Sequence, residues 1–151
     1  MSNTELIITS ESAMRAFGER FAATLRGDEC LELIGDVGAG KTTFVKGLAK
    51  GLGILEDVQS PSFTISRVYT APSGQRLDHY DFYRLPDAGI LEYEFAESLE
   101  DPQVITVVEW ADVVHDILPA HRITVRISPT GDNETTRKVI LETADNRNEG
   151  R

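Results

Sequence analysis

The sequence has a single cysteine, no long apolar run and no cluster of positive charge. Because Cys30 is the only cysteine in 151 residues, no disulfide framework can form within one chain. No apolar stretch is long enough to cross a bilayer, and the first residues lack the basic and then apolar order of a secretory signal. We therefore expect a cytoplasmic protein that does not associate with a membrane.

Positive charge is scarce throughout the chain. The 15 Lys and Arg residues are outnumbered by 25 Asp and Glu residues, which gives a formal net charge of −10. An acidic chain without a basic patch is repelled by a nucleic-acid backbone. We therefore expect no tight, direct binding of RNA, and any function on RNA would need a partner protein to hold it.

Residues 35–43, with the sequence GDVGAGKTT, match the pattern G-x-x-x-x-G-K-[ST] in full. They follow a short apolar run at 30–34 and precede apolar residues at helical spacing, namely Phe44, Val45, Leu48, Ala49 and Leu52. A strand, a glycine-rich loop and a helix in this order predict a phosphate-binding loop, or P-loop. A plain glycine-rich turn is the alternative, but it would not require all four specified residues.

The residue types of this loop match the chemistry of triphosphate binding. Glycines let successive backbone N–H groups turn toward an anion, and the helix that begins near Lys41 adds its positive end. We expect Lys41 to reach the β- and γ-phosphates of a nucleotide and the Thr42 hydroxyl to hold Mg²⁺. Thr43 has no fixed role in the pattern; it stands at the start of the helix and is a further candidate contact of the nucleotide.

A second informative stretch is the apolar run at 104–109, which ends in Glu109. A buried strand that ends in a carboxylate is typical of the acidic partner of a P-loop, which binds Mg²⁺ directly or through water. The usual residue is Asp, and Glu109 is one methylene longer. A strand that ends at the surface in an incidental acid is the alternative.

The remaining patterns predict the rest of an α/β fold. A short edge strand at 6–8 precedes a helix with the apolar stripe Ala13, Met14, Phe17, Phe21 and Leu25, which Ser10 or Ser12 can cap. Alternating runs predict one hairpin from 64–70 and 76–82 and another from 121–128 and 138–141. An acidic helix is expected over 88–99. We predict one P-loop NTPase domain over residues 1–144, with a mixed, mostly parallel sheet flanked by helices and antiparallel hairpins, and a polar tail over 145–151.

Two further features have more than one interpretation. The segment Ser60-Pro61-Ser62 is either a loop that senses the γ-phosphate or a plain proline turn. His79 and Asp81 lie two residues apart on one strand and therefore on the same face. They form either a catalytic dyad or, more commonly, a site where the histidine is hydrogen-bonded for structure. His115 and His121 are expected at the surface.

The P-loop, the Ser-Pro-Ser-Phe segment, the run HYDFYR at 79–84 and Val-Glu-Trp at 108–110 occur in one small chain. In this order and at these distances, they resemble the bacterial TsaE family, also called YjeE. The resemblance covers nearly the whole chain. It implies an ATPase that acts with the proteins TsaB and TsaD, which together install the threonylcarbamoyl group on adenosine 37 of tRNA. ATP hydrolysis by the small ATPase lets the TsaB–TsaD complex turn over repeatedly.

The resemblance also implies roles for individual residues. The phosphates would be contacted by Val37, Gly38, Ala39, Gly40, Lys41 and Thr42. Thr42 and Glu109 would hold Mg²⁺, Asp81 would position the metal's water or the attacking water, and Trp110 would lie against the nucleotide. Ser10 and Glu11 would approach the adenine or ribose. The family commonly has Thr where this chain has Ser62.

Three function classes remain open. The first is an ATPase that is slow alone and completed by its partner, with Lys41, Asp81 and Glu109 as its catalytic residues and Arg84 as a candidate arginine finger. The second is a small-molecule kinase, which usually has an arginine-rich lid that is not visible here. The third is a nucleotide-responsive binding module without turnover. The absence of an N-K-x-D pattern favours adenine over guanine weakly.

Overall fold

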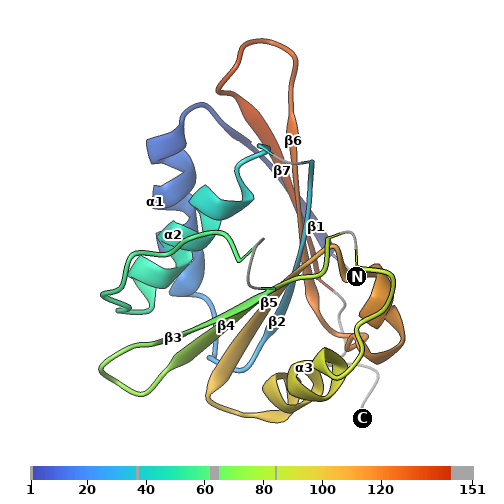
Figure 1. The fold of residues 1–151 in the computed structure, drawn as a ribbon. Helices are drawn as coiled ribbons and strands as arrows, with labels where there is room; N and C mark the ends of the chain where they lie inside the picture. The colour runs from blue at the N-terminus through green and yellow to red at the C-terminus, as the bar shows by residue number, and fades with distance from the viewer. Residues whose placement is uncertain (1, 37, 62–64, 84, 144–151) are drawn as a thin grey trace.

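The structure is a computed structural model that describes residues 2–36, 38–61, 65–83 and 85–143. Figure 1 shows a central twisted sheet with helices packed against it. The elements, in chain order, are β1 (Ser2–Ile8), α1 (Glu11–Ala22), β2 (Cys30–Ile34), α2 (Lys41–Gly51), β3 (Ser66–Thr70), β4 (Arg76–Asp81), α3 (Leu91–Glu100), β5 (Val104–Glu109), the 3₁₀ helix η1 (Ala111–Ile117), β6 (Ile123–Pro129) and β7 (Arg137–Thr143).

The strands form one mixed sheet with the order β1-β7-β6-β2-β5-β4-β3. The four central strands, β6, β2, β5 and β4, are parallel to their neighbours. β3 is antiparallel to β4 at one edge, and β7 and β1 continue the sheet in antiparallel pairs at the other. The predicted α/β fold is therefore confirmed, including both hairpins and the edge strand at the start of the chain.

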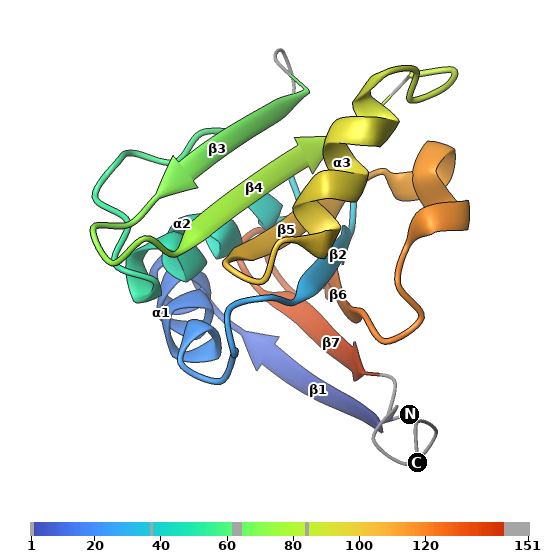
Figure 2. The same ribbon diagram turned by 90° about the horizontal axis from the view of Figure 1, so that it is seen from below.

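Helices cover both faces of this sheet. α1 and α2 lie on one face, and α3 and η1 lie on the other (Figure 2). Side chains along the central strands alternate between two cores. Leu77 and Ile105 join the core beneath α1 and α2, whereas Tyr80 and Val108 join the core beneath α3. Odd-numbered residues of β4 and β5 therefore face α2.

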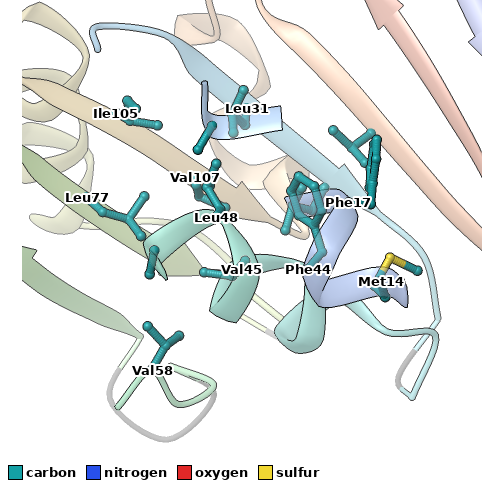
Figure 3. Close-up of a cluster of buried hydrophobic side chains, with 14 of the residues drawn as sticks. Met14, Phe17, Leu31, Phe44, Val45, Leu48, Val58, Leu77, Ile105 and Val107 are labelled. Carbon is teal, nitrogen blue, oxygen red and sulfur yellow. The ribbon is translucent and has the colours of Figure 1, made fainter. Parts of the chain in front are cut away.

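α1 and α2 pack closely because small residues lie at their contact. A Cβ atom on Gly47 would lie 2.0 Å from the carbonyl oxygen of Arg15, and one on Gly18 would lie 2.4 Å from that of Phe44. The aromatic rings of Phe17 and Phe44 meet with their centroids 5.6 Å apart, and both side chains are labelled in the buried cluster of Figure 3. The predicted apolar stripe of α1 is thus a core surface, which holds α2 and the loop before it against the sheet.

Local signals explain where these helices begin. The Ser10 hydroxyl accepts a hydrogen bond from the backbone N–H of Ala13 at 3.0 Å, which caps α1 as predicted. α2 begins at Lys41, and Gly40 precedes it in the left-handed conformation, with φ of 110°. α3 begins at Leu91 rather than at 88, because Gly89 takes a positive φ of 56° and the chain turns there first.

Two expectations are tested only in part by the described residues. Among the described residues, no helix is long and apolar enough to cross a membrane. The predicted polar tail at 145–151 lies outside the described residues, as does Thr64 at the start of the predicted hairpin, so the domain boundary at 144 stays a prediction. β3 itself begins at Ser66.

Candidate nucleotide and metal site

The carboxyl ends of β2, β5 and β4 meet at one edge of the sheet. The P-loop follows the last residue of β2, and Glu109 and Asp81 are the last residues of β5 and β4. Glu109 and Asp81 are register partners on these adjacent parallel strands, so the sheet itself brings the two acids together. Ligands gather at this edge in open α/β sheets.

The P-loop needs its glycines for geometric reasons. Gly38 and Gly40 have φ values of 85° and 110°, a region that side chains disfavour. At Gly35, a Cβ atom would lie 2.5 Å from the carbonyl oxygen of Ile127 on β6, so only glycine lets the loop pass that close. Val37, one of the predicted phosphate contacts, lies outside the described residues.

Lys41 is buried, with 6% of its surface exposed, which is unusual for a lysine. Its Nζ atom donates a hydrogen bond to the carbonyl oxygen of Gly35 and lies 3.4 Å from Oε1 of Glu109. The same ammonium lies 4.5 Å from the centroid of the Trp110 ring, which is within the range of a cation–π contact. The predicted phosphate-binding cation is therefore held in place at the mouth of the P-loop by an acid and an aromatic ring.

Glu109 is held from a second side by His79. Nε2 of His79 lies 2.6 Å from Oε2 of Glu109, and both side chains are buried. Burial acts to raise the pKa of the Glu109 carboxyl. The hydrogen bond and electrostatic attraction from His79, together with those from Lys41, outweigh it and hold that pKa below its usual value. Glu109 is thus an ionised carboxylate at neutral pH.

This contact bears on the two interpretations of His79 that the sequence left open. One was a catalytic dyad with Asp81 of the same strand, because residues two apart share a face, and the other was a histidine that is hydrogen-bonded for structure. The carboxylate that His79 reaches is that of Glu109 on the neighbouring strand, whose own register partner is Asp81. The second interpretation, a buried histidine that is hydrogen-bonded, is confirmed. His115 and His121 are exposed, as predicted.

Asp81 is also buried, with 6% of its surface exposed. Its Oδ1 atom accepts a hydrogen bond of 2.9 Å from the backbone N–H of Tyr83, which fixes the orientation of the carboxylate. The backbone N–H of Asp81 donates to the carbonyl oxygen of Ile65 at 2.7 Å. Asp81 is therefore anchored on both sides before any ligand arrives.

These residues line a hollow of about 220 Å³ beside the P-loop. Its walls are formed by Gly38, Gly40, Lys41, Thr42, Thr43, Ser60, Asp81, Tyr83, Glu109 and Trp110. A cation, two carboxylates and a hydroxyl fit the needs of a phosphate and of Mg²⁺, which binds through one or two carboxylates together with substrate phosphates. The donor set therefore fits both groups, and Thr42 and Glu109 are the residues that would hold the metal.

Trp110 forms one wall of this hollow. It is half-buried, and its ring lies 4.7 Å from that of Tyr83, centroid to centroid. Its backbone has φ and ψ of 55°, a left-handed conformation that is rare outside glycine, at the point where the chain leaves β5. The strained turn directs the ring over Lys41 rather than into the core.

A second hollow, of about 180 Å³, lies on the other side of the P-loop. Ser10 and Glu11, which the resemblance placed near the adenine or ribose, line it with Gly38, Ala39, Gly40 and Thr43. The two hollows share Gly38, Gly40 and Thr43, so they lie next to each other along the P-loop. An elongated ligand across the loop would contact both.

The second hollow also has walls that the sequence did not indicate: Glu134, Thr135 and Arg137. Nε of Arg137 donates a hydrogen bond of 3.0 Å to the carbonyl oxygen of Ala39, across 98 positions of sequence. The Thr135 hydroxyl donates to the carbonyl oxygen of Thr9 at 3.0 Å, just before α1. The turn between β6 and β7 therefore connects the P-loop to the start of α1. No local sequence pattern predicts such contacts.

The segment before β3 reaches the first hollow through Ser60. Ile65, which follows it, has a φ of 71°, an outlier for a β-branched residue. Strained residues of this kind gather at sites and switch regions, which favours the sensing loop over the plain proline turn. Ser62 and Arg84, the other residues singled out for this side of the site, lie outside the described residues.

The family model described as "Threonylcarbamoyl adenosine biosynthesis protein TsaE" matches residues 8–139, which is most of the chain. The chain belongs to the TsaE family. The predicted resemblance is thereby confirmed. The match includes the P-loop, His79, Asp81 and Glu109, so the whole site described above lies within the family's region.

Individual TsaE relatives agree with this assignment. The protein named "tRNA threonylcarbamoyladenosine biosynthesis protein TsaE" in Bacillus subtilis (strain 168) is 37% identical over 139 residues, which cover 89% of this chain and 82% of the relative. The protein of the same name in Streptomyces coelicolor is 41% identical over 118 residues, 76% of this chain and 78% of the relative. A crystal structure of Bacillus subtilis YdiB is similar with a TM-score of 0.77 and 33% identity, over 99% of this chain and 90% of that one.

Proposed function

We propose that this TsaE family member is an Mg²⁺-dependent ATPase that acts in the threonylcarbamoylation of adenosine 37 in tRNA. Its ATP hydrolysis would allow the TsaB–TsaD complex to turn over repeatedly, and the chain would meet tRNA only through that complex. The names of its relatives support the pathway. The observation that carries the ATPase activity is the convergence of Lys41, Asp81 and Glu109 on one hollow beside the P-loop.

Hydrolysis of ATP requires that the phosphates be held, that the developing charge be neutralised and that a water be directed in line. The backbone of Gly38 and Gly40 and the ammonium of Lys41 would serve the first requirement. Mg²⁺ held by Thr42 and Glu109 would neutralise charge on the phosphate oxygens. Asp81, anchored by Tyr83 and Ile65, is the carboxylate that would orient the water.

Lys41 must exchange partners for this to happen. Its ammonium is paired with Glu109, and the same ammonium would have to turn toward the phosphates when a nucleotide binds. Glu109 would then be free on its Oε1 side to contact the metal. Binding of a triphosphate would therefore break the pair of Lys41 and Glu109. Lys41 would then contact the phosphates, and Glu109 would contact the metal.

A partner could supply a further positive charge to this site, in addition to Arg84, the chain's own candidate arginine finger, which lies outside the described residues. Among the described residues that line the hollow beside Lys41, there is no arginine. An arginine supplied in trans stabilises the transition state of phosphoryl transfer strongly. We therefore expect the isolated chain to hydrolyse ATP slowly and the TsaB–TsaD complex to accelerate it.

Phosphate release tests the proposal. The purified chain is incubated with Mg·ATP, alone and with TsaB–TsaD, beside the variants Lys41→Ala, Asp81→Ala and Glu109→Ala. We expect slow release from the chain alone, faster release with the complex and no turnover in the variants. Asp81→Ala and Glu109→Ala should retain measurable ATP binding, whereas Lys41→Ala should lose most of it. Turnover of several per second by the chain alone, with no gain from the partners, would contradict the partner requirement.

The same assay separates the two other function classes. A small-molecule kinase would produce a phosphorylated acceptor instead of free phosphate. A binding module without turnover would bind Mg·ATP and release no phosphate even in a single-turnover experiment. A pull-down from cell extract with and without ATP would identify the partners independently of these names.

A further inference from the structure

The carboxylate of Glu109 is held at both of its oxygens by different groups. Oε2 lies 2.6 Å from Nε2 of His79, and Oε1 lies 3.4 Å from Nζ of Lys41. His79 has no exposed surface, and Glu109 and Lys41 have 4% and 6%. Three ionisable side chains therefore share one buried position at the end of the central sheet.

The two partners of Glu109 differ in their freedom to move. Lys41 reaches the carboxylate from the first residue of α2 through four flexible methylene groups. His79 stands on β4, beside β5, with its whole ring enclosed. When Lys41 turns toward a phosphate, His79 is the partner that stays.

Within the described residues, the buried ring of His79 makes one hydrogen bond, the contact with Glu109. Its other ring nitrogen, Nδ1, is buried without a hydrogen-bond partner in the part of the chain that the structure describes. An unsatisfied polar atom inside a protein costs stability, and such an atom in a native structure calls for an explanation. A role in orienting the Glu109 carboxylate explains why a histidine occupies this position. An apolar residue of the same volume would fill the space without leaving a polar nitrogen unpaired.

We propose that His79 is a positioning residue for Glu109. By holding Oε2, His79 turns Oε1 toward the P-loop and keeps it there after Lys41 has left, so that the carboxylate meets Mg²⁺ in one fixed orientation. Replacing a residue that orients a metal ligand through a hydrogen bond typically lowers metal affinity or activity about 10- to 100-fold. This inference rests on the proposed Mg·ATP site and adds to it a residue that touches neither the metal nor the nucleotide.

The test measures the Mg²⁺ requirement of nucleotide binding rather than activity. Trp110 is the single tryptophan and lies against Lys41, so its fluorescence should report binding of a non-hydrolysable ATP analogue. Two variants are compared with the native chain. His79→Leu removes the donor at similar volume, and His79→Gln keeps a donor near the position of Nε2. Each is titrated with Mg²⁺ at saturating analogue, and analogue affinity is measured separately in EDTA.

We expect His79→Leu to raise the Mg²⁺ concentration for half-maximal binding about tenfold or more. Its analogue affinity in EDTA should stay within about twofold of the native value, because the phosphate cradle is untouched. His79→Gln should recover most of the Mg²⁺ response. In a Glu109→Gln background, His79→Leu should no longer change the Mg²⁺ requirement, since the carboxylate that it orients is gone.

A matched control is Thr106→Val on β5. Thr106 is 1% exposed, and its hydroxyl, like Nδ1 of His79, has no hydrogen-bond partner within the described residues. Thr106 lies on the α3 face of the sheet, so its replacement should leave the Mg²⁺ requirement unchanged. Should His79→Leu fail to fold, His79→Asn takes its place, because the shorter amide does not reach Oε2.

Some outcomes would overturn the role of His79 and leave the proposed function intact. These are an unchanged Mg²⁺ requirement in His79→Leu, equal shifts in His79→Leu and His79→Gln, or a matching loss of affinity in EDTA. If the native chain bound the analogue with no dependence on Mg²⁺, both the metal site and the role of His79 would fail. If it bound with Mg²⁺ but released no phosphate from ATP, the ATPase proposal would fail and the role of His79 would stand.

Discussion

At the scale of single residues, the site is organised by a buried lysine and the acid that faces it. Lys41 has almost no contact with water, and the carbonyl oxygen of Gly35, the carboxylate of Glu109 and the ring of Trp110 replace its hydration. Removing water makes each of these interactions stronger than it would be at the surface. A phosphate entering the hollow would therefore meet an ammonium that is already desolvated.

The first prediction concerns the charge of Lys41. Lys41→Met keeps most of the apolar stem and removes the ammonium, and a hydrogen bond to a charged group contributes about 1.5–3 kcal/mol. We expect the dissociation constant of Mg·ATP to rise about ten- to a hundredfold, measured by titration calorimetry. Lys46→Met on the exposed side of the same helix is the control. If both variants bound Mg·ATP with the same affinity, the prediction that Lys41 contacts the phosphates would be wrong.

The second prediction concerns the reactivity of Cys30. Its thiol lies in β2 with 6% of its surface exposed, and burial, the largest influence, raises its pKa to about 12. Since only the thiolate reacts readily, a disulfide reagent such as Ellman's reagent at pH 8 should not label the folded protein within minutes. In guanidinium chloride it should label one thiol per chain. Rapid stoichiometric labelling of the folded protein would show that β2 opens.

At the scale of elements, the P-loop depends on a strand that lies far away in the sequence. Arg137 at the start of β7 donates to the carbonyl oxygen of Ala39 in the loop and also to those of Glu134 and Thr136 in the turn before it. The side chain thus joins the two walls of the second hollow. The loop glycines alone would leave this part of the backbone with more freedom.

The third prediction tests this connection. Arg137→Met removes the donors and keeps the apolar stem, so the P-loop should lose part of its order before binding. We expect Mg·ATP affinity to fall severalfold, because ordering the loop must then be completed at binding. Arg126→Met is the control, since Arg126 pairs with Glu142 on the neighbouring strand and lies on the sheet face opposite α1 and α2, unlike Val125 and Ile127. The idea is wrong if both variants bind Mg·ATP as the native chain does.

The fourth prediction concerns the contact between α1 and α2. A Cβ atom on Gly47 would lie 2.0 Å from a backbone carbonyl of α1, so Gly47→Ala must push the helices apart. We expect a loss of about 1–3 kcal/mol in the free energy of unfolding, measured in urea. Lys46→Ala, at an exposed position of the same helix, should stay within about 0.5 kcal/mol. A Gly47→Ala variant as stable as the native chain would show that the contact can relax.

At the scale of the whole molecule, charge decides which partners are accessible. The chain carries a formal charge of −10, and Lys41, the cation beside the P-loop, is buried against Glu109. A surface of this sign repels polyanions unless a partner provides the contact. This agrees with our proposal that the chain meets tRNA only through a partner complex.

The fifth prediction follows from that charge. The isolated chain should not retain tRNA in a filter-binding or gel-shift assay at about 0.15 M salt, because counterion release by clustered Lys and Arg is what drives such binding. Retention should appear only when TsaB and TsaD are added. Binding by the chain alone at submicromolar concentration, weakened by added salt, would contradict this prediction.

Much of this architecture could be predicted from local patterns. The P-loop, its strand and helix, the acid at the end of β5 and both hairpins depend on neighbouring residues. Alternation, helical spacing and turn-forming residues report such neighbours directly. Asp81 and Trp110 were predicted from the family resemblance, and the structure brings both to the hollow beside Lys41. The difference at α3 was small and local, because a left-handed Gly89 delays the helix.

The partners of the site residues depended on the tertiary structure alone. His79 shares a strand with Asp81 but pairs with Glu109, 30 positions away, because parallel strands place β4 beside β5 in a register that no local pattern specifies. Arg137 meets Ala39, 98 positions away, because β7 lies beside β6 and β6 lies beside β2, which leads into the P-loop. The sequence by itself determined a phosphate loop and the acid at the end of β5, since those depend on short-range geometry. Which side chains orient them was decided by the order and register of the sheet, which arise from packing over the whole chain.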